Sequence, residues 1–262
     1  MQRRNAKGEI RKWGISQVYR RFAAFLYVGQ ANRVYFRMHG VSDEKLFLAP
    51  HAVDNDRFVS AEPRAREDAS KWRVELGISE DRLVILFAGK LEEKKRPLDL
   101  LEAFRRLNRN DVSLLFVGNG AQQAQLRERA AAVPSVFFAP FQNQSAMPRT
   151  YATGDLFVLP SQGPEESWGL AVNEALCLSL PVVVSSHVGC AADLVHEGRN
   201  GWIFPAGDIG ALTKTLREAL ADRDQLLRFG EEGRRIVSDY NYGAATRGLE
   251  EALAYTVAVR GR

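Results

Sequence analysis

From residue 83 onward, short runs of consecutive apolar residues alternate with longer segments whose apolar residues recur at helical spacing. The apolar runs predict strands at 83–88, 112–117, 136–139, 156–159 and 182–185, with a weaker sixth strand at 202–204. The intervening segments predict helices at 64–76, 98–107, 122–132, 145–152, 170–178 and 191–196. Continuously apolar strands that alternate with amphipathic helices are typical of a parallel sheet covered on both faces. We therefore predict a doubly wound α/β domain.

The two ends of the chain follow another pattern. Residues 11–38 carry apolar positions at helical spacing and predict two helices, broken near Gly29 and ended by Gly40. Residues 47–53 predict a strand that runs into a turn, and DNDRFV (54–59) predicts a polar loop. The last predicted helices lie near 210–221, 224–238 and 244–258. The resulting division is a basic helical segment (1–46), an α/β domain (47–240) and a C-terminal helix (241–262).

Composition agrees with a globular protein and adds one asymmetry. The chain has 262 residues, of which 45% are hydrophobic and 26% charged, enough for one large or two small domains. Residues 1–40 hold nine Lys or Arg against one acid, Glu9, so this segment carries +8 in a chain of net charge +4. A solvated basic helix explains this segment, but it can also attract an anionic membrane surface. No aromatic–basic surface predicts nucleic-acid binding.

Cysteines and histidines provide no evidence for a metal site. The two cysteines lack metal-ligand spacing and a pairing signature, and the four histidines are scattered. These residues are Cys177, Cys190, His39, His51, His187 and His196. No apolar run reaches the about 18 residues of a membrane span, and the first residues do not form a signal peptide. We therefore expect a cytoplasmic protein, in a reducing compartment, without a metal cofactor.

The residues that follow the strands carry the candidate chemistry, because ligands of doubly wound sheets bind beyond the carboxyl ends of the strands. The first strand is followed by GKLEEKKRP, which contains Lys90 and Lys95. These cations suit a phosphate, although lysines at the surface before a helix are common. The second strand is followed by Gly118-Asn-Gly120, which is weak evidence for nucleotide binding, and no Gly-x-Gly-x-x-Gly or Walker motif occurs.

The loop after the fourth strand is the strongest candidate site. It reads PSQGPEESWGL (160–170) and opens a helix, whose free N–H groups around Trp168–Leu170 suit a diphosphate. Gly169 lets a ligand approach the backbone closely. Glu166 in the loop and Glu174 in the helix can face one ligand, and carboxylates accept hydrogen bonds from sugar hydroxyls. An acidic first turn that complements the helix dipole explains the same glutamates without a ligand.

Several of these segments together resemble one family. Glu166 and Glu174 match the Glu-x7-Glu motif of retaining glycosyltransferases with the GT-B fold, family 4 type, and PSQGPEESWGLAVNEALCLSLPVVVS resembles the block around that motif. GKLEEKKRPLDLLEAF, VGCAADLVHEGRNGWIFPAGD and FLAPHAVDNDRF resemble further blocks. The resemblance spans residues 25–255 and implies a Rossmann-like, donor-binding C-terminal half. The implied activity is transfer of a sugar from a nucleotide-diphosphate sugar, such as a UDP-sugar, with retention, in polysaccharide biosynthesis.

The resemblance also implies residue roles. Glu166 would be the catalytic residue, contacting the donor sugar near its reacting carbon. Glu174 would bind the ribose and Lys95 the diphosphate, and the backbone near Phe141 and Gln142 is a candidate for reading the base. The implied donor-binding residues are Lys90, Lys95, Ser167, Trp168, Gly169, Leu170 and Glu174. No metal is implied.

This sequence departs from the family pattern at several positions. Lys90 stands where arginine is usual and cannot form a bidentate contact with phosphate. Trp168 replaces phenylalanine, Ser179 stands where glycine is preferred, and Asp193 replaces glutamate. The largest departure is that only a helical segment precedes residue 47, whereas the family has an N-terminal Rossmann domain that holds the acceptor. We therefore expect either a fragment or a chain whose partner supplies that half.

Two other functions stay open at this point. A nucleotide-sugar 2-epimerase with the GT-B fold would act on the donor without an acceptor. A non-catalytic module would bind the nucleotide sugar while a partner chain does the chemistry. The resemblance also suggests that residues 1–40 contact the inner face of an anionic membrane that carries a lipid-linked acceptor. The expected small-molecule partner in all these hypotheses is a nucleotide sugar.

Overall fold

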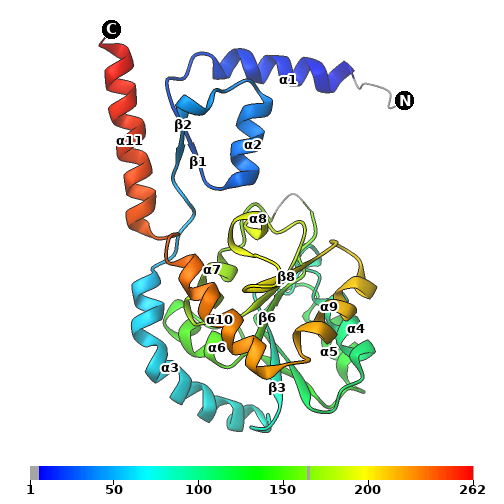
Figure 1. Ribbon diagram of the computed structural model, residues 1–262. Helices are drawn as coiled ribbons and strands as arrows, with labels where there is room; N and C mark the ends of the chain where they lie inside the picture. Colours follow the sequence, from blue (N-terminus) through cyan, green and yellow to red (C-terminus); the bar gives the residue numbers. More distant parts are fainter. Residues whose placement is uncertain (1–5, 164–165, 262) are drawn as a thin grey trace. The chain divides into compact units, whose positions relative to one another are not determined.

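The computed structural model describes residues 6–163 and 166–261 (Figure 1). The described residues form two compact units: 53–239 make up the larger, and those up to Ala52 together with those from Tyr240 make up the smaller. The larger unit contains a six-stranded parallel sheet in the order β5-β4-β3-β6-β7-β8. These strands are β3 (Leu83–Ala88), β4 (Val112–Val117), β5 (Val136–Ala139), β6 (Leu156–Leu159), β7 (Val182–Ser185) and β8 (Gly201–Phe204). The prediction of a doubly wound parallel sheet is confirmed.

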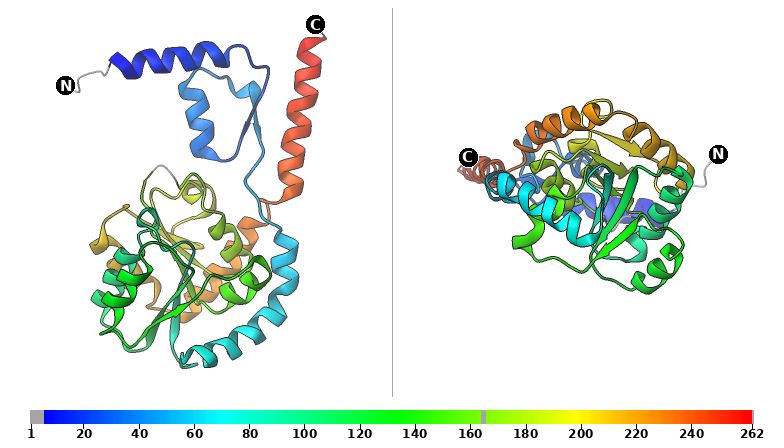
Figure 2. Two further views of the ribbon diagram at one scale, coloured as in Figure 1. Left: turned by 180° about the vertical axis from the view of Figure 1, so that it is seen from behind. Right: turned by 90° about the horizontal axis from the view of Figure 1, so that it is seen from below.

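Helices cover both faces of this sheet, as the views in Figures 1 and 2 show. One face carries α4 (Pro97–Leu107), α5 (Gln123–Ala130) and α9 (Ile209–Ala219). The opposite face carries α3 (Asn55–Leu76), α6 (Met147–Ala152), α7 (Leu170–Cys177) and α10 (Arg223–Val237). Short helical segments complete the unit: η2 (Glu93–Lys95), η3 (Gln144–Ala146) and α8 (Ala191–Leu194). Each of these two helical layers shields one face of the apolar sheet from water.

The central strands are buried on both sides. All residues of β3 and β4 are buried, which explains why these segments are apolar without alternation. Ile85 and Phe87 point into the core beneath α4, α5 and α9. Burial of each such side chain stabilises the fold by about 1.5–3 kcal/mol. The strand order reverses between β3 and β6, and this reversal places the switch point of the sheet at their carboxyl ends.

The segment 54–59 is not the predicted loop. Helix α3 begins at Asn55, and the carboxylate of Asp54 accepts a hydrogen bond from the Arg57 N–H at 3.0 Å. This contact is the cap that aspartate provides at helix starts. Phe58 is fully buried, with its ring against Tyr151. The polar composition of DNDRFV concealed a capped first turn that is held in place by one buried aromatic residue.

The smaller unit contains a strand at 25–27, within the first of the two helices that the sequence predicted for 11–38. Its elements are α1 (Ala6–Tyr19), β1 (Phe25–Tyr27), α2 (Gln30–Met38), η1 (Asp43–Lys45), β2 (Leu46–Leu48) and α11 (Tyr242–Arg260). Residues 25–27 pair in parallel with 46–48. The helical prediction for 25–27 was therefore wrong, because a strand partner about 20 residues away leaves no trace in local periodicity. Tyr27, Val41 and Leu46 form the small core.

The C-terminal helix belongs to this same unit, which differs from the predicted division at 46/47 and 240/241. A Cβ on Gly248 of α11 would lie 1.8 Å from the carbonyl oxygen of Leu48, so only glycine permits this approach of helix to strand. The rings of Phe47 and Tyr255 are 5.4 Å apart between centroids. Within the described residues, every helix is too short or too polar to cross a membrane.

Candidate functional site at the carboxyl edge of the sheet

The loops after β3 and β4 touch along their backbones. A Cβ on Gly118 would lie 2.0 Å from the Gly89 carbonyl oxygen, and one on Gly120 would lie 2.4 Å from that of Leu91. The Leu91 N–H donates to the Asn119 carbonyl at 2.9 Å. Loop packing thus accounts for Gly118 and Gly120 without a nucleotide.

The loop that contains Glu166 is anchored by the loop after β7. The Gly189 N–H donates to the Glu166 carbonyl at 3.1 Å, and the Cys190 N–H donates to the Trp168 carbonyl at 2.9 Å. A Cβ on Gly189 would lie 2.0 Å from the Ser167 carbonyl oxygen. The serine–glycine turn at 185–189 therefore fixes the backbone of 166–168.

Gly169 opens α7 in a conformation suited to glycine. It is the N-cap of the helix, its φ is +97°, and it offers no side-chain cap to the N–H groups of the first turn. Leu170 is 44% exposed and Ser167 is exposed, so this helix start faces solvent. Trp168 instead is buried, and its ring N–H donates to the Asn173 side chain at 2.9 Å. Trp168 therefore anchors the loop after β6 to the protein interior.

The structure brings Lys95 and Glu166 together. The Lys95 ammonium forms an ion pair with Oε2 of Glu166, and the two side chains are only 18% and 11% exposed. The hydroxyl of Ser161, which is fully buried, donates to the same oxygen at 2.8 Å. Two residues 71 positions apart thus form one charge-balanced cluster. Their mutual attraction offsets the cost of removing both charges from water.

Lys90 lies outside this cluster. Its side chain is 75% exposed, and its ammonium lies 3.8 Å from a carboxylate oxygen of Glu92. An exposed pair of this kind contributes little to stability. The two lysines that the sequence placed in one phosphate site therefore have different surroundings.

Glu174 has its own set of partners. The Tyr151 hydroxyl donates to Oε2 of Glu174 at 2.8 Å. Burial raises the pKa of Glu174 above its ordinary value, and the Tyr151 hydrogen bond, the charge of Arg57 and a hydrogen bond with Gln144 oppose this rise. Arg57 in turn donates to both the carbonyl and the side chain of Gln144, at 2.7 and 2.9 Å. Glu174 is therefore surrounded by α3, α6 and the loop after β5.

The loop after β5 connects Glu174 to the candidate base site. Phe141 is 69% exposed, and its N–H lies 3.4 Å from the Asn119 side-chain oxygen. Gln142 accepts a hydrogen bond from Arg149 at 2.9 Å. Ser161, Tyr151, Arg57 and Gln144 escaped the sequence analysis. Ser161 lies just beyond the end of β6, after Pro160, and could have been found by the strand-end rule, whereas the other three are recognisable only from the fold.

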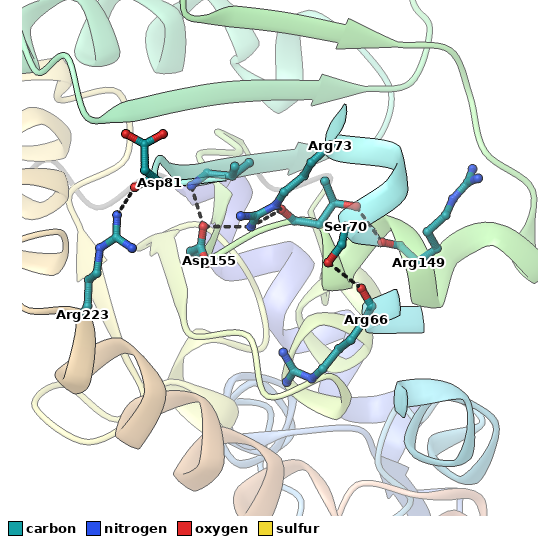
Figure 3. A network of polar contacts seen from close by, with 9 residues as sticks. Arg66, Ser70, Arg73, Asp81, Arg149, Asp155 and Arg223 are labelled. Carbon is teal, nitrogen blue, oxygen red and sulfur yellow. Dashed lines mark hydrogen bonds and ion pairs between the residues drawn. The ribbon is translucent and has the colours of Figure 1, made fainter. Parts of the chain in front are cut away.

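A cavity of about 510 Å³ lies at the opposite, amino edge of the sheet. Its lining includes Leu83, Asp155 and Pro181, which stand at or just before the starts of β3, β6 and β7. Figure 3 shows the polar network beside it: Asp155 accepts from the Val84 N–H at 2.7 Å and from Arg73 at 2.9 Å. These groups tie α3 to two strand starts, and we assign them a structural role.

The fold and the edge residues define an α/β protein with a candidate ligand site at the switch point of a parallel sheet, where a buried lysine–glutamate pair lies beside an open helix start. The chain belongs to the family of glycosyl transferases group 1, whose family model matches residues 68–236.

Curated relatives resemble this chain over most of its length. The sulfoquinovosyl transferase SQD2 of Arabidopsis thaliana is 31% identical over 205 residues, which cover 77% of this chain and 38% of SQD2. A D-inositol 3-phosphate glycosyltransferase of Geodermatophilus obscurus is 30% identical over 202 residues, which cover 72% of this chain and 43% of that protein. The chain thus spans less than half the length of these two relatives.

Solved structures share the fold. The crystal structure of Anabaena HepE in complex with UDP and glucose superposes with a TM-score of 0.75 at 22% identity, covering 95% of this chain and 67% of HepE. Sucrose-phosphate synthase from Thermosynechococcus elongatus superposes with a TM-score of 0.72 at 21% identity, covering 97% of this chain and 63% of that enzyme.

The described residues of this chain contain no group of three or more His, Cys, Asp or Glu placed to hold a metal ion.

Proposed function

We propose that this chain is the donor-binding half of a glycosyltransferase that moves a sugar from a nucleotide-diphosphate sugar to an acceptor. The observation that carries the proposal is the buried cluster of Lys95, Glu166 and Ser161 beside the open start of α7. The family supports it, and so does the UDP bound to HepE. Of the donor-binding residues that the Glu-x7-Glu resemblance implies, we retain Lys95, Gly169, Leu170 and Glu174 as ligand contacts.

The proposed chemistry follows from the charge that develops on the leaving diphosphate. The N–H groups at the start of α7 and the Lys95 ammonium would stabilise that charge as the bond to the sugar breaks. An ammonium has three donors, so Lys95 can keep its bond to Glu166 while it donates to a phosphate oxygen. We propose that this diphosphate binding needs no metal ion, and that addition of EDTA leaves nucleotide affinity unchanged.

Glu166 would act at the sugar. Among the described residues, Ser161 and Lys95 both contact Oε2 of Glu166, and we propose that Oε1 accepts a hydrogen bond from a donor-sugar hydroxyl. The pair thus places a hydroxyl acceptor and a phosphate donor side by side, as the junction between sugar and diphosphate requires. We propose that the acceptor hydroxyl attacks on the face from which the diphosphate leaves, so the configuration is retained. The new carbon–oxygen bond forms as the bond to the diphosphate breaks, and the hydroxyl proton passes to the departing phosphate oxygen.

A nucleotide panel tests the proposal. The chain is titrated calorimetrically with UDP, GDP and ADP. In a second assay, the release of UDP from UDP-glucose and of GDP from GDP-mannose is followed with and without a membrane extract as the acceptor source. Binding with acceptor-dependent release supports a transferase. Binding without release supports a module that works with a partner chain, and sugar conversion without acceptor supports an epimerase. Absence of nucleotide binding overturns the assignment.

We further propose that α1 contacts an anionic membrane at its inner face, where a lipid-linked acceptor would be presented. Ile10 and Trp13 of this helix are 69% and 66% exposed, and Arg11 and Lys12 between them are exposed as well. Apolar anchors among basic residues suit an interface with anionic lipid. The test is co-sedimentation with vesicles: Trp13→Glu should reduce binding to anionic vesicles, and equal binding to neutral vesicles would contradict the proposal.

A further inference from the structure

The carboxylate of Glu174 is held mainly by neutral hydrogen-bond donors. The Tyr151 hydroxyl donates to Oε2 at 2.8 Å, and Gln144 contributes a second hydrogen bond. Within residues 6–163 and 166–261, Glu174 forms no ion pair, whereas Glu166 is paired directly with Lys95. The direction in which the Glu174 carboxylate points is therefore set by uncharged neighbours.

Tyr151 is itself held rigidly. It is only 1% exposed, and its ring packs against Phe58 of α3 and Phe157 of β6, with centroids 6.3 and 5.6 Å away. The position of its hydroxyl is thus determined by the core. Burial, together with the charge of Glu174, raises the pKa of Tyr151, so the hydroxyl keeps its proton and remains a donor.

We propose that Tyr151 is a positioning residue for the nucleotide: its hydroxyl holds one oxygen of Glu174 so that the other accepts hydrogen bonds from the ribose hydroxyls of the donor. This inference rests on the proposed function, and it assigns a role to a side chain that does not itself contact the ligand. Tyr151 lies on a short helix, 23 residues before Glu174, and no motif marks it.

The chemical reason is that a ribose diol needs an acceptor. An ionised carboxylate accepts hydrogen bonds at both oxygens, whereas a protonated one turns one oxygen into a donor. Glu174 is half-buried, and burial favours its protonated form. A hydrogen bond donated by Tyr151 favours the ionised form. Tyr151 therefore orients the carboxylate and favours its ionised form.

The other groups around Glu174 act in defined directions. The positive charge of Arg57 on α3 lowers the pKa of Glu174, as does the hydrogen bond with Gln144 of η3. Cys177, on the same helix as Glu174, has its pKa raised to about 12 and stays a neutral thiol. The charge of Arg234 on α10 lowers the pKa of Cys177, and the charge of Asp54 raises it. Removing the Tyr151 hydroxyl leaves these influences in place and raises the pKa of Glu174.

The experiment replaces the hydroxyl alone. Tyr151→Phe keeps the ring and its packing. Affinity is measured by calorimetry from about pH 4.5 to about pH 8, an interval that begins near the ordinary glutamate pKa of about 4.3 and ends above neutrality. The ligand is whichever of UDP, GDP and ADP the wild type binds most tightly. We expect affinity at neutral pH to fall about tenfold, the value of one hydrogen bond to a charged group. We also expect the acid limb of the affinity profile to move to higher pH.

Two comparisons separate positioning from a general loss of packing. Thr150→Val removes a neighbouring, fully buried hydroxyl that donates to the Ala146 carbonyl, so it should lower stability without moving the affinity or its pH profile. In a Glu174→Gln background, Tyr151→Phe should cause little further loss, because the carboxylate that it positions is gone. Should Tyr151→Phe not fold, 3-fluorotyrosine in place of Tyr151 strengthens the donor and should move the acid limb to lower pH.

The possible results are distinct. If the wild type binds nucleotide and Tyr151→Phe binds it with the same affinity and the same pH profile, the positioning role is overturned while the proposed function stands. If Tyr151→Phe weakens binding equally with and without Glu174, the effect is one of packing and the proposal also fails. If the wild type binds no nucleoside diphosphate, the proposed function fails, and the role of Tyr151 fails with it.

Discussion

The carboxyl and amino edges of the same sheet use buried charge in different ways. At the amino edge, Asp155 accepts from a strand N–H and from Arg73, and Arg73 also donates to the Thr153 carbonyl. At the carboxyl edge, Lys95 and Glu166 pair with each other and are both more sheltered than Asp155, and the Ser161 hydroxyl donates to the same oxygen of Glu166. The pair at the amino edge thus ties a helix to two strand starts, whereas the pair at the carboxyl edge joins two loops beside the open start of α7, where we propose that a ligand binds.

The largest expected effect lies at the carboxyl edge. Glu166→Ala should reduce sugar transfer about 10³-fold, because a preorganised hydrogen bond to the reacting sugar is lost. Diphosphate binding should persist, since Lys95 and the α7 start remain. The measurement is turnover of UDP-glucose or GDP-mannose with acceptor, alongside calorimetry. Turnover like that of the wild type would remove Glu166 from the catalytic role.

The amino edge should respond in stability alone. Asp155→Ala leaves the Val84 N–H and the Arg73 guanidinium without their partner, and we expect a loss of about 3 kcal/mol in the free energy of unfolding. Denaturant titration measures this loss, and nucleotide affinity at a temperature where the variant is folded should be unchanged. Lys71→Ala, which breaks only an exposed pair with Glu67, is the control and should cost about 0.5 kcal/mol or less. A variant that is stable but binds nucleotide poorly would erase the distinction between the edges.

The two lysines of the loop after β3 sharpen the comparison within one edge. Lys95→Met should weaken UDP or GDP binding about 30-fold, as expected for a sheltered, charge-assisted contact of about 2 kcal/mol. Lys90→Met should change the affinity for UDP or GDP about twofold or less, because the Lys90 side chain is 75% exposed in this structure. Calorimetry on both variants decides the matter. Equal losses would mean that Lys90 joins the phosphate site when the ligand binds.

The smallest expected effect concerns Ser179, at the amino edge. This residue has φ +55° in the turn after α7, a conformation that favours glycine. Ser179→Gly should therefore stabilise the chain by about 1 kcal/mol, visible as a higher melting temperature. The carbonyl oxygen of Ser179 would lie 1.9 Å from a Cβ on Gly230. Gly230→Ala should therefore lower the melting temperature strongly and serves as the opposite control. A lower melting temperature for Ser179→Gly would show that the serine side chain stabilises this turn.

The sequence predicted the parts of the fold that depend on local pattern. The six strands of the larger unit were found because strands buried on both faces are apolar throughout, as β3 and β4 are. Glu166 and Lys95, which the structure brings together, were predicted as candidates because they follow strands in loops where parallel sheets bind ligands. Strand 25–27 and the first turn of α3 were missed, since their stability comes from the distant partners 46–48 and Tyr151.

The sequence by itself determined the class of fold, the family resemblance and the two glutamates eight positions apart. Only the tertiary structure decided what holds each of them. It paired Glu166 with Lys95, left Lys90 in solvent, and placed the Tyr151 hydroxyl on Glu174. The physical reason is that strand and helix patterns record whether a side chain is buried. Which charged or polar groups meet beneath the surface depends on how distant segments pack, and residues 71 and 23 positions apart carry no local sign of their contact.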